Sequence, residues 1–233
     1  MSEFIGAFHA FSIKIGGAGY GYRKSGETDR TGSFIPLQSG NGIYSIRIME
    51  NIVDSKYAEL YSTTCDVQMT DEFQPFIRSS DYAAFDEGSE CVKLASELAG
   101  DCADDTEIVA AIYDYICDNI VYDTEKAASV TSGYMPVPDD TLKEKKGICF
   151  DYASLAAAML RSQAIPTKLV FGYVSPDDLY HAWNMFYTEQ TGWVTVSYQV
   201  SADSWNRLDL TFSANGADDT FIGNGGNYSD VYF

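Results

Sequence analysis

The stretch KKGICFDYASLAAAMLRSQ, residues 145–163, places one cysteine, Cys149, at the start of the clearest helical pattern in the chain. The run of alanine and leucine behind it predicts a helix over residues 149–163. Pro166 stops this helix, because proline cannot continue the backbone hydrogen bonds. A thiol at a helix N-terminus faces the positive end of the helix dipole, which favours the nucleophilic thiolate. This placement is what covalent catalysis by cysteine requires.

A histidine in the stretch YHAWNMFY, residues 180–187, is the second candidate. His181 stands 32 residues after Cys149 (181 − 149), and strand alternation puts it on one face with Trp183. Because the pKa of histidine lies near neutrality, His181 can take the thiol proton and return it to a leaving group. A lone histidine on a strand is more often structural, but the combination with Cys149 favours a catalytic pair.

The third group of such a site should hold the imidazole in one tautomer and orientation. Ser197, at the end of GWVTVS, occupies the nearer position and orients a histidine poorly. Asp209 in WNRLDLTF, 28 residues after His181 (209 − 181), is the expected partner. Asp203 is the fallback, although its surroundings, SADS, predict a turn with a solvated carboxylate.

Other residues near Cys149 have expected places. Tyr173 in FGYV is expected on a neighbouring strand, where it lines the cleft, and Trp183 is a second candidate for substrate contact; for both, packing is the alternative. Asp151 is expected to cap the helix amides. Gly147 is expected to permit an unusual turn and to leave room for a substrate. The unpaired backbone amide of Cys149 is the expected oxyanion donor.

The pattern of the chain changes near residue 81. Before it, FSIKI, GIYSIRIME and CDVQM alternate apolar and polar residues and predict strands, while the glycine-rich GGAGYGYRKSGETDRTGS predicts a long loop. After it, isoleucines four residues apart predict a helical face, and strand patterns follow Pro166. Helices followed by antiparallel strands predict an α+β fold. We expect a β-rich accessory module at residues 1–80 and a catalytic domain at residues 81–233.

The composition excludes several classes of function. The chain has 34 acidic and 15 basic residues, a net charge of −19, so nucleic acid is not an expected partner. Residues 1–80 carry a net −2 and residues 81–233 a net −17, which favours a solvated acidic surface over an attraction for cationic substrates. The five cysteines form no CxxC pair and there are only two histidines, so we expect no structural metal and no cofactor.

Several ordered motifs over about residues 85–215 resemble the transglutaminase-like superfamily. These motifs are GICFDYASLAAAMLRSQAIPTKLVFGY, HAWNMFY, GWVTV and LDLTF. In that family a Gly-x-Cys opens a helix, His-Ala-Trp begins a strand and an Asp-x-Thr closes a triad. The resemblance implies a papain-related fold, in a bacterial member with an N-terminal β-module, and a Cys149, His181 and Asp209 triad. Many members place the aspartate where this chain has Ser197, and nothing marks the calcium sites of animal transglutaminases.

The resemblance also implies a class of reaction. Active members form a thioester with the substrate acyl group, which water or an amine then resolves. We therefore expect acyl transfer or hydrolysis at peptide or side-chain amide bonds of a protein or peptide substrate, with some substrates at the cell surface. The alternative is an inactive member of the family that binds partners as a scaffold.

The N-terminal sequence MSEFIGAFHAFSIKI has too short an apolar run for a secretory signal, and no run of eighteen apolar residues predicts a membrane span. A β-module rich in tyrosine, asparagine and glycine joined to such a core resembles bacterial exported proteins. We expect an extracytoplasmic protein whose leader is absent from this sequence, with the cytoplasm as the alternative.

Overall fold

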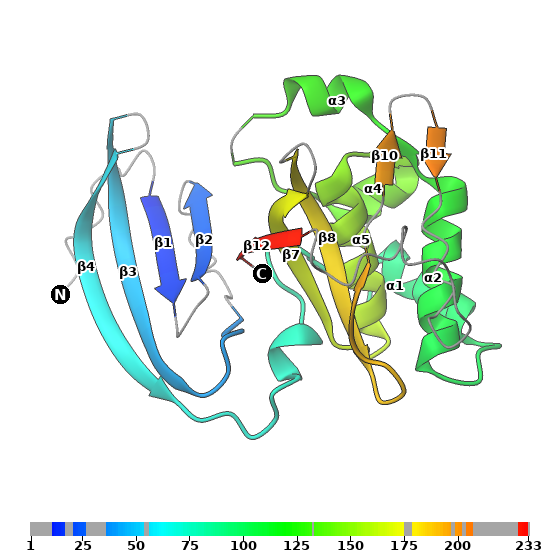
Figure 1. The fold of residues 1–233 in the computed structure, drawn as a ribbon, viewed down its shortest axis with the longest axis horizontal. Helices are drawn as coiled ribbons and strands as arrows, with labels where there is room; N and C mark the ends of the chain where they lie inside the picture. Colours follow the sequence, from blue (N-terminus) through cyan, green and yellow to red (C-terminus); the bar gives the residue numbers. More distant parts are fainter. Residues whose placement is uncertain are drawn as a thin grey trace. The chain divides into compact units, whose positions relative to one another are not determined.

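In the computed structural model the chain divides into two units, Met1–Glu72 with Tyr232–Phe233 and Phe73–Val231 (Figure 1). The structure describes residues 11–16, 21–26, 36–53, 56–131, 133–174, 179–196, 199–201, 204–206 and 228–232. The boundary lies at residue 72 rather than at residue 80, because the segment that follows it packs on the second unit.

The N-terminal unit contains an antiparallel sheet with the strand order β2-β1-β3-β4. The loop that we expected after FSIKI contains a strand, β2, so that expectation was wrong. β2 is at the edge of this sheet, and main-chain pairing with β1 does not require apolar side chains. The bounds are β1 Phe11–Gly16, β2 Gly21–Gly26, β3 Gly42–Val53 and β4 Lys56–Val67.

The second unit has the expected α+β architecture, in which helices pack on a mainly antiparallel sheet of order β12-β7-β8-β9. Figure 1 shows α1, α2 and α5 grouped on one side of this sheet. The helices are η1 Gln74–Phe76, α1 Glu90–Ala99, α2 Asp105–Asn119, α3 Thr124–Ser129, α4 Pro138–Glu144 and α5 Cys149–Ser162. The strands are β5 Val121–Tyr122, β6 Lys146–Gly147, β7 Thr167–Val174, β8 Leu179–Thr188, β9 Gly192–Val196, β10 Gln199–Ser201, β11 Ser204–Asn206 and β12 Tyr228–Tyr232.

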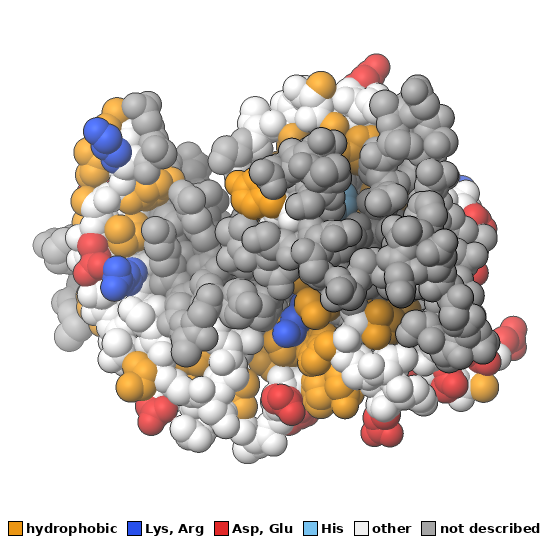
Figure 2. Space-filling view, in the orientation of Figure 1, with side chains coloured by type: hydrophobic (Ala, Val, Ile, Leu, Met, Phe, Trp, Pro, Cys, Tyr) orange, Lys and Arg blue, Asp and Glu red, His pale blue; other side chains and the backbone are white. Residues whose placement is uncertain are grey.

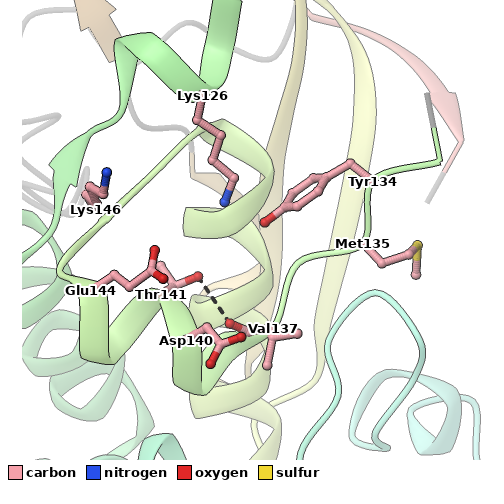
Figure 3. A pocket seen from close by; sticks show the side chains of 8 residues that line it. All are labelled: Lys126, Tyr134, Met135, Val137, Asp140, Thr141, Glu144 and Lys146. Carbon is pink, nitrogen blue, oxygen red and sulfur yellow. Dashed lines mark hydrogen bonds between the residues drawn. The ribbon is translucent and has the colours of Figure 1, made fainter. Parts of the chain in front are cut away.

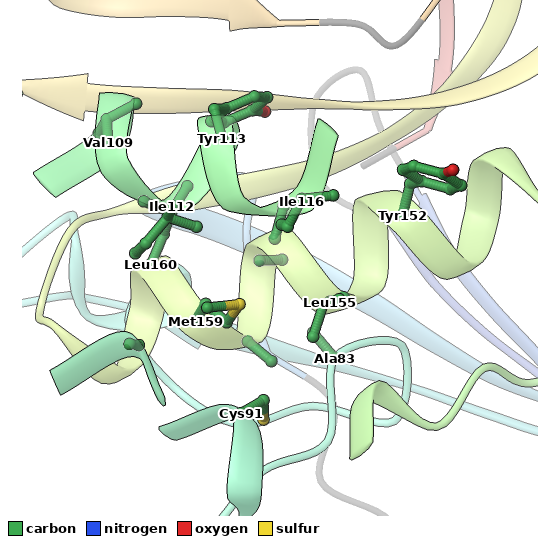
Figure 4. Packing of buried hydrophobic residues seen from close by; sticks show 14 of the residues in the cluster. Ala83, Cys91, Val109, Ile112, Tyr113, Ile116, Tyr152, Leu155, Met159 and Leu160 are labelled. Atoms are coloured by element: carbon green, nitrogen blue, oxygen red, sulfur yellow. The ribbon is translucent and has the colours of Figure 1, made fainter. Parts of the chain in front are cut away.

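Helix α5 is the centre of this unit and confirms the helix predicted at residues 149–163. All residues from Asp151 to Arg161 are buried. α1, α2 and α4 pack around the helix, and β7 and β8 cover its remaining side. Its alanines allow this close approach, and a helix that is apolar on every side is typical of a buried core. Figure 4 shows side chains of α2 directed towards those of α5, with Cys91 of α1 nearby.

Helix α2 also forms where the isoleucine pattern predicted it. The Asp104 carboxylate accepts a hydrogen bond from the Glu107 backbone N–H at 3.0 Å and caps the first turn. Ile112 and Ile116 have no exposed surface and Ile120 is 4% exposed, so this stripe faces the core.

A buried arginine joins the start of the second unit to its core. Arg161, 3% exposed, donates from Nε to the Thr167 carbonyl at 2.9 Å. Its Nη1 donates to the Arg78 carbonyl and to Ser80 Oγ, both at 3.1 Å. Nearby, the rings of Phe76 and Trp193 meet edge to face at 5.3 Å. These contacts explain why residues 73–80 belong to the second unit.

On the face drawn in Figure 2, Asp and Glu side chains are scattered over the molecule. This agrees better with a solvated acidic surface than with a focused binding site for cations. Among the described residues, no helix combines the length and apolar character needed to span a bilayer.

We expect Arg161→Met to lower the free energy of unfolding by about 2–4 kcal/mol, because it removes a buried cation and leaves its three acceptors unsatisfied. Urea denaturation followed by tryptophan fluorescence measures the change. Arg78→Met is the matched control, since the Arg78 side chain is exposed and, among the described residues, donates to Gln74 Oε1. Equal stability of the two variants would contradict the role given to Arg161.

Candidate active site

The predicted nucleophile lies at the first residue of α5, where the helix meets strand β8. Cys149 is partly exposed, and its sulfur accepts a hydrogen bond from the backbone N–H of Ala182. One turn along the helix, Asn184 Nδ2 of the same strand donates to the Ala153 carbonyl at 3.0 Å. Strand β8 therefore runs along α5 and crosses its N-terminus at the residue next to His181.

The Ala182 amide reaches the sulfur because no neighbouring strand uses it in the described residues. β9 pairs with β8 only from Asn184 to Thr188. Ala182 lies two residues beyond the last of these pairs, at Asn184. This main-chain donor is a feature of the site that the sequence did not reveal.

Ala182 follows His181 directly on β8. His181 is 8% exposed, and its ring stacks on that of Trp183 with 6.5 Å between centroids and an interplanar angle of 20°. We expected Trp183 to contact substrate, but its side chain has no exposed surface, so it packs on the histidine instead. Tyr173, which is 44% exposed, remains a candidate for substrate contact.

The structure brings together Cys149 and the strand that carries His181. The carboxylate expected to orient the histidine, Asp209, lies outside the described residues, as do Asp203 and Ser197. Between the histidine strand and Asp209 in the sequence, β10 and β11 form a separate antiparallel pair in which Ser201 is opposite Ser204. The three-residue triad therefore remains a prediction.

The pKa of the Cys149 thiol differs from our expectation. Burial raises it above the ordinary value and is the largest influence, and the charge of Asp151 raises it further. The N–H groups of Ala182 and of Phe150, in the first helical turn, oppose this by stabilising the thiolate. The helix N-terminus alone thus does not produce a low thiol pKa, because the same packing that positions the sulfur removes it from water.

The carboxylate of Asp151 holds the first turn of α5 in place, as the sequence predicted. Asp151 has no exposed side-chain surface, and its Oδ2 accepts from the Ile148 N–H and from Lys126 Nζ, each at 2.8 Å. The Tyr134 hydroxyl donates to Oδ1. Burial, together with this bond to Asp151, raises the pKa of Tyr134 to about 12. A buried carboxylate needs such partners, but Lys126 and Tyr134 were not identifiable from sequence spacing.

Glycine is needed at residue 147 for a different reason from the one we expected. A Cβ at residue 147 would lie 2.5 Å from Asp151 Cβ and 3.0 Å from Asp151 Oδ2. The missing side chain therefore leaves room for the capping carboxylate rather than for a substrate. Gly147 does not have a positive φ, so the turn itself does not demand glycine.

A polar pocket of about 200 Å³ lies beside Lys126 and Tyr134 (Figure 3). Its carboxylates are Asp140 and Glu144. Its two lysines are already engaged, since Lys126 pairs with Asp151 and Lys146 pairs with Asp123 at 3.0 Å. We assign no catalytic part to this pocket. Within the ranges that the structure describes, no three His, Cys, Asp or Glu side chains are grouped so that they could bind a metal ion.

The chain is similar to known proteins over part of its length. Residues 92–198 match the family model described as the transglutaminase-like superfamily. Kyphoscoliosis peptidase of Mus musculus is 29% identical over 151 residues, which cover 60% of this chain and 21% of that protein. The matched region thus spans about a fifth of the length of that relative.

Two solved structures are similar over parts of the chain. A candidate cysteine protease from Cytophaga hutchinsonii is 27% identical and covers 55% of this chain and 42% of its own, with a TM-score of 0.46. The periplasmic domain of TgpA from Pseudomonas aeruginosa is 16% identical and covers 83% of this chain and 88% of its own, with a TM-score of 0.42.

Replacing Gly147 tests the contact with the capping carboxylate. We expect Gly147→Ala to destabilise the protein by about 1–3 kcal/mol, because the new methyl group would displace Asp151 from the first turn of α5. Gly88→Ala is the control: its Cβ would approach only Asp86 Oδ1, at 3.2 Å on an exposed loop. Thermal melting of both variants gives the comparison, and a Gly147→Ala protein as stable as Gly88→Ala would refute the explanation.

Proposed function

The part of the chain at residues 92–198 belongs to the transglutaminase-like superfamily, and on this premise we propose that it transfers or hydrolyses acyl groups through a cysteine thioester. The substrate is a peptide bond or a side-chain amide of a protein or peptide. Cys149 is the proposed nucleophile and His181 the base and acid. Asp209 is the proposed orienting carboxylate.

The observation that carries this proposal is the contact between the Cys149 sulfur and the Ala182 amide. It brings the thiol to the residue that follows His181 on β8. Backbone amides that surround a nucleophile also serve chemistry, since they stabilise negative charge on a reacting carbonyl oxygen.

The proposed reaction has two steps. His181 accepts the thiol proton, the sulfur attacks the carbonyl carbon, and the oxyanion is held by backbone N–H groups near Cys149. His181 then gives its proton to the amine, the C–N bond breaks, and the acyl group remains on sulfur as a thioester. In the second step His181 takes a proton from water or from an acceptor amine. That nucleophile displaces the sulfur, which recovers the proton.

The raised pKa of Cys149 makes His181 necessary in this scheme. Burial disfavours an isolated thiolate, so the negative sulfur needs the positive imidazolium beside it. If the imidazolium does not form, the raised pKa of Cys149 leaves the thiol unreactive. That outcome favours the rival function, a transglutaminase-like scaffold that binds without turnover. The reactivity of the sulfur distinguishes the two.

We also propose an extracytoplasmic site of action, on the composition of the N-terminal unit. The substrate would then be a protein or peptide outside the cytoplasm.

The pH dependence of iodoacetamide labelling at Cys149, read by peptide mass spectrometry, tests the pairing. In the unaltered protein we expect the imidazolium to favour the thiolate, so Cys149 should label at lower pH than burial alone would allow. His181→Ala leaves only the effect of burial, so the labelling curve should move to higher pH and the rate at pH 7 should fall by about tenfold or more. His9→Ala, which removes the other histidine of the chain, should leave the curve unchanged.

Identical curves for the His181→Ala and unaltered proteins would refute the pairing and support the scaffold. The other four cysteines provide an internal reference for reagent and pH in the same digest. Cys102 is a suitable one, because burial and three neighbouring carboxylates raise its pKa as well.

A further inference from the structure

A row of aromatic rings runs from Phe150, the residue after Cys149, to Tyr180, the residue before His181, and on to Tyr173. The Phe150 ring meets that of Phe171 edge to face at 4.8 Å, and Tyr82 lies 5.6 Å from both. Phe171 stacks on Tyr180 at 6.4 Å, and Tyr180 meets Tyr173 at 5.4 Å. We call these five residues the aromatic strip.

The strip lies on the sheet face that α5 covers. In the β7–β8 register Phe171 is opposite Ala182 and Tyr173 is opposite Tyr180. Residues directly opposite, or two apart on one strand, project from the same face. Asn184 is two residues beyond Ala182, and its side chain donates to the Ala153 carbonyl of α5. The exposed end of the strip therefore shares its face with the helix.

The strip reaches from α5 to the part of β8 beyond the helix contacts. Phe150 belongs to the first turn of α5, directly after Cys149. Asn184 of β8 contacts the second turn of α5, and Ala182 contacts Cys149 at its first residue. The next residue on the same face of β8 is Tyr180.

Exposure increases along the strip away from the core. Phe171 is 6% exposed, whereas Tyr173 and Tyr180 are 44% and 48% exposed. Tyr82 is held against α5, since its carbonyl accepts a hydrogen bond from Ser154 Oγ at 2.6 Å. A fixed aromatic base with two exposed rings offers a surface for a large apolar group. The strip contains no charged side chain, so it offers no ion pair to a substrate.

We propose that the aromatic strip is a substrate subsite that binds a large apolar or aromatic side chain next to the carbonyl attacked by Cys149. This inference rests on the proposed acyl-transfer function for its role in catalysis. Tyr173 and Tyr180 would form the contact surface, and Phe171 with Tyr82 would support them. The preferred substrates would be peptides with a bulky apolar residue beside the reacting amide, rather than substrates chosen by charge.

Two alkylating reagents test the subsite without a known substrate. The rate of Cys149 labelling by N-benzyl iodoacetamide is divided by its rate of labelling by iodoacetamide. The same ratio is measured at Cys102, which reports the intrinsic reactivity of the two reagents. The corrected ratio is the Cys149 ratio divided by the Cys102 ratio. We expect the corrected ratio to exceed one in the unaltered protein. It should fall by about two- to tenfold in Tyr180→Ala and Tyr173→Ala, because each removes an aromatic contact with the benzyl ring.

Two further variants distinguish loss of the aromatic contact from a nonspecific effect of replacing a tyrosine. Tyr180→Phe keeps the ring and should keep the ratio, while Tyr61→Ala removes a 57% exposed tyrosine from the N-terminal sheet and should also leave it unchanged. A corrected ratio of one in the unaltered protein, or one insensitive to both alanine variants, overturns the subsite.

The outcome of this test is distinguishable from that of the proposed function. If His181→Ala leaves labelling by plain iodoacetamide unchanged but the benzyl preference depends on Tyr180, the acyl-transfer proposal fails and the subsite stands as a binding surface. If labelling depends on His181 but shows no benzyl preference, the chemistry stands and the subsite fails.

Discussion

The burial of α5 on every side is the constraint on which the rest of the structure depends. A helix enclosed by three helices and a sheet cannot shift, so its first residue has one position relative to β8. Asp151 completes this by capping the Ile148 amide while Lys126 balances its charge. The place of Cys149 at the edge of β8 is therefore a consequence of core packing.

The same packing also changes the pKa of the Cys149 thiol. Enclosing the first turn removes the Cys149 sulfur from water, and this raises the thiol pKa more than the nearby amides lower it. Such a partly exposed thiol is held in position, while its surroundings disfavour the thiolate. A neighbouring base then decides whether it reacts, which gives His181 its significance in the proposed mechanism.

The sequence predicted the parts of the fold that depend on local patterns. The helix at residues 149–163 was recognisable from its apolar run, and the isoleucine stripe of α2 from its four-residue spacing. Features that depend on tertiary contacts were not accessible. β2 pairs through its main chain, Gly147 makes room for a side chain four residues away, and Lys126 reaches Asp151 from another helix. Asp209 remains a prediction from motif order, since it lies outside the described residues.

Covalent capture of an acyl group is the most direct measurement of the central claim, that the sulfur at the tip of α5 is a catalytic nucleophile. The protein is mixed with p-nitrophenyl acetate, quenched in acid and digested, and the acetylated peptides are identified by mass spectrometry. We expect one acetyl group on Cys149 that disappears on further incubation and is absent in His181→Ala. Acetylation spread over the other cysteines, or equal acetylation of Cys149 without His181, would contradict it.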